Sequence, residues 1–199
     1  MSENSVNYLD LLNNEQKKAV QNTKGSLLVL AGAGSGKTRV LTFRILHILY
    51  NKLATPSQIL AVTFTNKAAN EMKTRIGKII NLPIDRMWVG TFHSLSLRIL
   101  QQHYEEVGLK KNFQIIDTDD QLKLIKNICE TEKIDTKEVS AKFYLNLIDS
   151  FKNKGITPES LKENKYRQND LELRIIYKIY QSELLRLNYV DFGDLILFC

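Results

Sequence analysis

A glycine-rich segment between an apolar run and a helical pattern constrains the fold of this chain more than any other feature. Four of its nine glycines lie between residues 25 and 36. The apolar run Ser26–Ala31 is typical of a strand buried on both faces of a parallel sheet. Residues 37–51 then carry apolar side chains at helical spacing. The sequence therefore predicts a strand, a tight loop and a helix in direct succession.

The composition of this loop is suited to phosphate groups. Residues 31–38 read AGAGSGKT, with Ala31 where such patterns usually have glycine. Glycines let the backbone fold closely around an anion, and the N–H groups at the start of the next helix point toward it. Lys37 can then reach the β- and γ-phosphates, and the Thr38 hydroxyl can bind Mg²⁺. The loop predicts a nucleoside triphosphate site; the alternative is a chance glycine-rich turn.

Strand and helix patterns alternate through the first half of the chain and give way to helices in the second. This alternation predicts an α/β fold with a parallel sheet and right-handed crossovers. After the loop, we expect strands at 59–63 and 87–90 and helices at 66–80 and 92–107. Further on, we expect a short strand at 113–116 and helices at 119–130, 136–153 and 170–188. A helical subdomain therefore starts near residue 110.

Composition excludes several classes of protein. The longest apolar runs, Leu27–Ala31 and Leu195–Cys199, have five residues, whereas a membrane span needs about 20. Residues 1–25 contain no apolar core of a secretory signal. Cys129 and Cys199 are the only cysteines, which provides no disulfide framework and no metal cluster. We therefore expect a cytoplasmic protein without membrane contact.

Charge is unevenly distributed along the chain, whose net charge is +6. Residues 1–100 hold 13 Lys and Arg against 5 Asp and Glu, a balance of +8, and residues 101–199 hold 15 against 17, a balance of −2. The basic first half indicates either a surface that binds a polyanion or an ordinary basic surface.

Polar segments at the ends of two expected strands suit single-stranded DNA. Phe64 lies among polar residues, beside Thr65 and Asn66, where a base can stack on the ring and phosphates can lie alongside. His93 follows the next strand in a similar segment, where it either caps a helix or contacts DNA. Earlier in the chain, Gln16 has an amide that can pair with the edge of adenine.

Four motifs in this order resemble the UvrD/PcrA/Rep group of superfamily 1 DNA helicases. They are Leu12–Gln16, Ala31–Thr38, Ala61–Met72 and Gly90–Leu95. The resemblance continues through residues 113–121, 152–160 and 190–195 and so covers nearly the whole chain. It implies an ATP-dependent DNA helicase or translocase that moves 3′ to 5′ on single strands in DNA repair or replication. The resemblance also implies ATP and Mg²⁺ as cofactors, and single-stranded DNA, single-strand/duplex junctions and repair proteins as partners.

The resemblance also implies roles for individual residues. Lys37 and Thr38 are the catalytic positions, and Thr38 is the Mg²⁺ ligand. Nucleotide contacts come from Gln16, Ala31, Gly32, Ala33, Gly34, Ser35, Gly36, Lys37, Thr38 and Arg39. DNA contacts come from Phe64, Thr65, Asn66, Thr91, His93 and Phe192. Gly193 stands where the family usually has Asp or Ala, so we expect a loosely held helix start beside Phe192.

Three regions follow from the resemblance. Residues 1–109 are the first part of a RecA-like ATP-binding domain, an incomplete P-loop NTPase sheet. Residues 110–190 are an inserted helical subdomain that touches duplex DNA, and residues 191–199 begin the return into the RecA-like domain. In the insert, Lys152 and Lys154 are expected either to contact DNA or to lie on a solvated surface.

The chain ends before the acidic motif that holds Mg²⁺ and orients water, and before the second motor domain, that the family has. Asp117, Asp119 and Asp120 match the family's linker and are not assigned a catalytic role. We therefore expect this chain to bind Mg-ATP, to hydrolyse little or none of it, and to be marginally stable because apolar sheet edges are exposed.

Two other functions compete with the helicase. One is a non-catalytic remnant that binds nucleotide or DNA. The other is a small P-loop kinase, which would have no use for the Gln16 motif or for an exposed Phe64.

Overall fold

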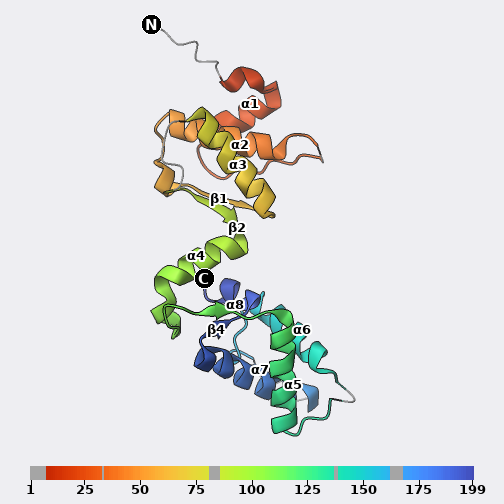
Figure 1. Cartoon of the computed structure of the whole chain (residues 1–199). Helices are drawn as coiled ribbons and strands as arrows, with labels where there is room; N and C mark the ends of the chain where they lie inside the picture. Colours follow the sequence, from red (N-terminus) through yellow and green to blue (C-terminus); the bar gives the residue numbers. More distant parts are fainter. Residues whose placement is uncertain (1–7, 33, 81–85, 137–138, 162–167) are drawn as a thin grey trace. The chain divides into compact units, whose positions relative to one another are not determined.

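The computed structural model describes residues 8–32, 34–80, 86–136, 139–161 and 168–199, so Ala33 of the phosphate loop lies outside the described residues. The chain forms two compact units, Met1–Phe92 and His93–Cys199 (Figure 1). We refer to them as the first and second units.

In its described residues, the first unit packs three α-helices against a two-stranded sheet. The short 3₁₀ helices η1 and η2 span Tyr8–Leu11 and Pro56–Gln58. The longer elements are α1 (Asn14–Gln21), α2 (Lys37–Tyr50), β1 (Leu60–Thr63), α3 (Asn66–Ile79) and β2 (Trp88–Thr91). β1 and β2 are parallel, with Leu60 opposite Trp88 and Thr63 opposite Thr91. The expected helix–strand alternation and parallel pairing are confirmed here.

The strand predicted at Ser26–Ala31 is absent. No strand is assigned there, and Leu28 and Leu30 are 81% and 86% exposed. A parallel strand needs a hydrogen-bonded neighbour, and within the described residues β1 pairs with β2 alone. Leu27 and Val29 are less exposed than Leu28 and Leu30. The prediction of a strand buried on both faces was therefore wrong.

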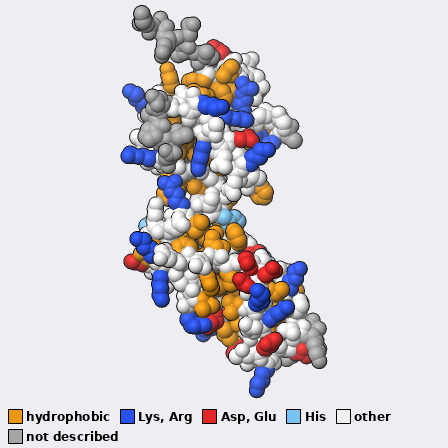
Figure 2. Space-filling view, in the orientation of Figure 1, with side chains coloured by type: hydrophobic (Ala, Val, Ile, Leu, Met, Phe, Trp, Pro, Cys, Tyr) orange, Lys and Arg blue, Asp and Glu red, His pale blue; other side chains and the backbone are white. Residues whose placement is uncertain are grey.

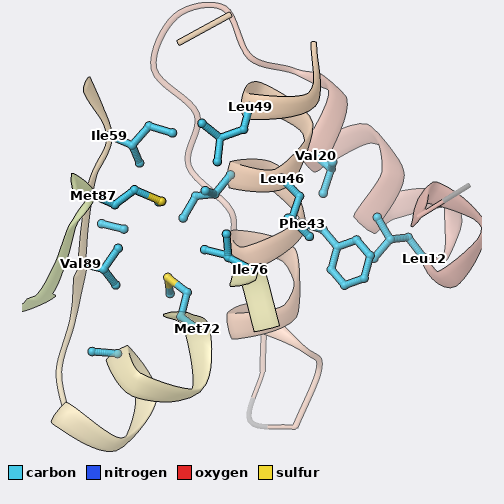
Figure 3. Close-up of a cluster of buried hydrophobic side chains, with 13 residues drawn as sticks. Leu12, Val20, Phe43, Leu46, Leu49, Ile59, Met72, Ile76, Met87 and Val89 are labelled. Carbon is cyan, nitrogen blue, oxygen red and sulfur yellow. The ribbon is translucent and has the colours of Figure 1, made fainter. Parts of the chain in front are cut away.

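One apolar core fixes α2 against the sheet. Leu49 of α2 points toward Ile59, just before β1, and Phe43 of the same helix turns toward Leu12 and Val20 (Figure 3). Burying such side chains contributes about 1.5–3 kcal/mol each. Because α2 begins at the phosphate loop, this core holds the loop's helical end in place.

The second unit is mostly helical, as the sequence predicts. Its elements are α4 (Phe92–His103, with Phe92 in the first unit), η4 (Tyr104–Val107), β3 (Gln114–Ile115), α5 (Thr118–Thr131), α6 (Ala141–Lys152), α7 (Gln168–Leu187), β4 (Tyr189–Val190) and α8 (Phe192–Leu197). β3 pairs in parallel with β4, a strand that the sequence patterns did not predict. The chain thus has a mixed α/β fold with little sheet and many helices.

Two clusters of buried side chains hold the second unit together. The larger joins α5, α6 and α7 and includes the fully buried Tyr144, Tyr177 and Tyr180. The smaller includes Leu100 of α4 and Leu195 of α8. The smaller cluster therefore connects α4, which carries His93, with α8, which carries Phe192.

Candidate nucleotide and DNA site

The phosphate loop has backbone geometry that favours glycine at two positions. Gly34 and Gly36 have φ values of +74° and +89°, in the left-handed region. Gly36 is also the N-cap of α2, and no side chain caps this helix there. The first N–H groups of a 14-residue helix are thus left without a side-chain cap at the end of the loop. An uncapped helix start of this kind favours anions.

Lys37 lies over the loop. Its Nζ donates hydrogen bonds to the main-chain oxygens of Ala31 and Gly32, at 3.0 and 2.7 Å. The Ser35 hydroxyl donates to the same Gly32 oxygen at 2.7 Å. Lys37 is exposed and Thr38 half-buried, so the ammonium can exchange these neutral acceptors for phosphate oxygens.

Gln16 joins α1 to the loop. Its Oε1 accepts from the Asn13 main-chain N–H, and the Asn13 side chain caps the helix by accepting from the Gln16 main-chain N–H. Its Nε2 donates to the Ser35 oxygen at 3.2 Å. A Cβ at Gly36 would lie 3.1 Å from this Nε2. Only a glycine leaves ordinary space for the Gln16 amide here.

Arg39, in the first turn of α2, lies beside the segment that precedes Gln16. Its guanidinium donates to the Leu11 oxygen at 2.5 Å and lies 5.6 Å from the centre of the Phe43 ring. The structure therefore groups Gln16, the loop and Arg39 at one end of α2.

The residues present fit a nucleotide phosphate group. The two left-handed glycines leave space that a side chain would narrow or strain, and a helix start and a lysine face the same loop. For a divalent cation the described part of the chain supplies less. It contains no group of three or more His, Cys, Asp or Glu side chains that could hold a metal ion, which leaves the Thr38 hydroxyl as the expected ligand.

The ends of β1 and β2 bring together four of the expected DNA contacts. Phe64 is 96% exposed, directly after β1. Thr65 caps α3 by accepting from the Ala68 N–H at 3.2 Å. The Thr91 hydroxyl, at the end of β2, donates to the Asn66 Oδ1 at 3.4 Å. An aromatic ring is therefore displayed beside a fixed polar edge, as the sequence predicts.

The other two expected DNA contacts, His93 and Phe192, lie against each other in the second unit. The rings of His93 and Phe192 lie edge to face, with centroids 5.9 Å apart and planes at 71°. Both side chains are exposed, Phe192 by 52%. The sequence predicts His93 and Phe192 as separate DNA contacts and does not predict that their rings touch.

Comparison with known proteins settles the family. The sequence profile of the UvrD/REP helicase N-terminal domain matches residues 12–199. This chain belongs to the UvrD/REP helicase family. A probable DNA helicase II homolog of Rickettsia felis is 45% identical over 98% of the chain and 30% of that protein. The ATP-dependent DNA helicase PcrA of Staphylococcus epidermidis is 42% identical over 94% of the chain and 26% of that protein.

The PcrA of Staphylococcus aureus strain Mu50 is similar, at 41% identity over 95% of the chain and 26% of that protein. The chain spans between about a quarter and a third of the length of these relatives. The resemblance seen in the four motifs is thus confirmed. None of the described helices of this UvrD/REP family chain is long and apolar enough to cross a membrane.

One expectation for the family's DNA contacts is wrong. Lys152 is neither a DNA contact nor a solvated surface lysine, because its side chain is fully buried. Its Nζ lies 2.6 Å from the Asp191 Oδ2 and 2.7 Å from the Asp194 Oδ1. Lys154 is exposed, so it can still reach a ligand. The charge of Lys152 was thus no guide to its burial.

The helix start at Phe192 is also held more firmly than expected. Asp191 and Asp194 form a capping box around it, with the Asp194 N–H donating to the Asp191 Oδ1 at 2.8 Å. Burial raises the pKa of the Asp194 carboxyl, while the neighbouring Lys152 ammonium opposes the rise. Burial also raises the pKa of Tyr180, whose hydroxyl stays protonated and donates to Asp191. The spacing Asp-x-x-Asp was the signal that could have predicted this cap.

Proposed function

We propose that this chain is the nucleotide-binding and part of the DNA-binding portion of an ATP-dependent DNA helicase. The helicase would move 3′ to 5′ along single strands and act at single-strand/duplex junctions in DNA repair or replication. One observation supports the ATP part most: Gln16, a side chain that can pair with adenine, is hydrogen-bonded to the phosphate loop itself. A loop that bound only phosphate would need no such amide.

In this proposal the loop residues 31–36 and the start of α2 hold the phosphates. Lys37 neutralises charge on the β- and γ-phosphates, and Thr38 binds Mg²⁺, which supplies charge neutralisation for phosphoryl transfer when bound. Gln16 and Arg39 lie on the nucleoside side. Hydrolysis further needs a carboxylate and a water-orienting base. The proposed nucleotide contacts, Gln16 and residues 31–39, include no carboxylate, so we expect these residues by themselves to bind Mg-ATP with little turnover.

The DNA part of the proposal uses two aromatic positions. Phe64 stacks a base, and Thr65, Asn66 and Thr91 contact the adjoining backbone. The His93–Phe192 pair offers a second stacking surface. Positive charge supports this assignment: in Figure 2, blue Lys and Arg side chains predominate over the first unit, whereas the second unit shows both signs.

We further propose the RecA-like division of the chain: residues 1–109 in the ATP-binding domain, 110–190 as an inserted helical subdomain, and 191–199 returning to the first. Repair proteins are proposed partners. Cys129 and Cys199 are free thiols, which suits a reducing cytoplasm.

A chimera tests the proposed function. Residues 12–199 replace the matching N-terminal segment of the Staphylococcus epidermidis PcrA, and strand displacement is measured on duplexes with a 3′ or a 5′ single-stranded tail. We expect ATP-dependent displacement from the 3′-tailed duplex only. Lys37→Ala should abolish it while DNA binding persists.

The opposite result favours the non-catalytic remnant. A chimera that melts cooperatively and binds both ATP and DNA, yet hydrolyses no ATP, contradicts the helicase assignment.

A further inference from the structure

A buried charge cluster in the second unit lies directly behind Phe192. Lys152, at the end of α6, is 0% exposed, and it pairs with Asp191 and Asp194 at 2.6 and 2.7 Å. Tyr180 donates to Asp191 at 2.9 Å, and Gln181 donates to Asp194 at 3.0 Å. Three charged side chains are thus removed from water together.

Every oxygen of the two carboxylates has a partner. Asp191 Oδ1 and Asp194 Oδ2 serve the capping box, accepting from the main-chain N–H groups of Asp194 and Asp191. The other oxygen of each accepts from Lys152. The ammonium therefore links both ends of the first turn of α8 to the end of α6.

Such a cluster is a poor source of stability. Desolvation offsets much of the attraction in a buried ion pair, and a well-packed apolar set of similar volume often does as well or better. What the cluster does provide is a fixed position for the start of α8. Phe192 is the first residue of that helix.

Gly193 shows how closely Lys152 approaches this turn. A Cβ at position 193 would lie 2.9 Å from the Lys152 Cδ and 3.0 Å from its Cβ. The aliphatic stem of Lys152 therefore packs against the bare backbone of residue 193. With a side chain there, Lys152 would have to shift from its place between the carboxylates.

We propose that Lys152 is a positioning residue: through Asp191 and Asp194 it holds Phe192 edge to face against His93, and the two rings act as one stacking platform for a base of single-stranded DNA. This inference rests on the proposed function for its DNA ligand. The ring pair itself, 5.9 Å between centroids, is formed by two side chains of this chain.

The first experiment follows the ring pair by NMR. The chain has three histidines, so the ring-proton signals of His93 can be resolved and assigned with a His93→Gln variant. Phe192→Leu removes the ring current and defines the signal of an unpaired His93. The neutral triple variant Lys152→Met/Asp191→Asn/Asp194→Asn keeps the volume and the caps but removes all three charges. We expect its His93 signal to move to the Phe192→Leu position.

The second experiment measures affinity for a fluorescent oligothymidylate by anisotropy. Phe192→Leu should weaken binding about tenfold, and the triple variant should weaken it as much while melting cooperatively. Adding Phe192→Leu to the triple variant should not weaken DNA binding any further. For the NMR experiment, Lys154→Met is the matched control: it removes an exposed charge two residues from Lys152 and should leave the His93 signal unchanged.

A cooperatively folded triple variant that keeps both the His93 signal and the affinity overturns the proposal. If the triple variant does not fold, Gly193→Ala provides the test, because it retains all three charges but displaces Lys152. An unchanged His93 signal in Gly193→Ala also overturns the proposal. If Phe192→Leu binds DNA like the parent chain, the DNA role of Phe192 is wrong, while the His93 signal still judges the positioning by Lys152.

Discussion

The side-chain amide of Gln16 donates a hydrogen bond to the main-chain oxygen of Ser35, 3.2 Å away. Its oxygen is held by the main-chain N–H of Asn13. In the proposed function, the side chain that reads the base is therefore attached to the loop that holds the phosphates. In that function, one residue couples base identity to loop geometry.

Replacing Gln16 should reduce the preference for adenine. In Gln16→Ala we expect ATP affinity to fall about three- to tenfold, because hydrogen bonds worth about 1 kcal/mol each are lost. GTP affinity should change little, so the ratio of the two affinities approaches one. Competition titrations against a fluorescent nucleotide measure both.

Asn13→Ala is the matched control for this loss. It removes the helix cap, which should lower the free energy of unfolding by about 1 kcal/mol, but leaves the Gln16 amide in the chain. The ATP preference should survive. An undiminished preference in Gln16→Ala would show that Gln16 does not read the base.

Phe64 should contribute to DNA affinity and not to stability. Base stacking on an aromatic ring is worth about 1–3 kcal/mol, so Phe64→Leu should weaken binding of an oligothymidylate about tenfold or more. Because Phe64 is 96% exposed, the melting temperature of the Phe64→Leu variant should stay near that of the parent chain. Phe143→Leu, at a ring 49% exposed on α6, is the control. Equal affinities for both variants contradict the stacking role.

His47 should make the stability of the first unit depend on pH. Burial, and secondarily Arg44, lowers the pKa of His47 below its usual 6.5. The unfolded chain therefore binds the proton first as pH falls, and the stability contributed by neutral His47 is lost from about pH 6.5 downward. The free energy of unfolding should fall less between pH 7.5 and 5 in His47→Gln. The same fall in both proteins counts against this.

The exposed apolar residues before the phosphate loop should promote self-association. Leu28 and Leu30 are more than four-fifths exposed, and an unpaired segment of this kind is a template for contact between chains. Leu28→Ser/Leu30→Ser should shift sedimentation toward monomer without lowering the melting temperature. Leu53→Ser, at a leucine 58% exposed elsewhere, should not. A double variant that associates as strongly as the parent chain refutes this role.

Local patterns predicted most helices of this chain well. The apolar spacing in residues 37–51 and 66–80 predicted α2 and α3, because helical periodicity is a property of the local sequence. Strand formation was less predictable. Residues 26–31 have the composition of a buried strand but lack a pairing partner in the described chain, and composition cannot supply one.

The candidate site divides in the same way. The left-handed Gly34 and Gly36 follow from the loop's composition, and the exposure of Phe64 follows from its polar neighbours. Contacts between distant residues did not follow: Gln16 with Ser35, His93 with Phe192, and Lys152 with Asp191 and Asp194. These contacts depend on the tertiary packing of α1, α6 and α8, which single-sequence patterns do not contain.

Calorimetric titration of this chain with a slowly hydrolysed ATP analogue and Mg²⁺ tests the central claim most directly. We expect one binding site, with affinity lowered about ten- to a hundredfold in Lys37→Ala, since a charge-assisted hydrogen bond is worth about 1.5–3 kcal/mol. Lys126→Ala, an exposed lysine on α5, should bind like the parent chain. No binding by the parent chain, or equal affinity in Lys37→Ala, would contradict a nucleotide site at this loop.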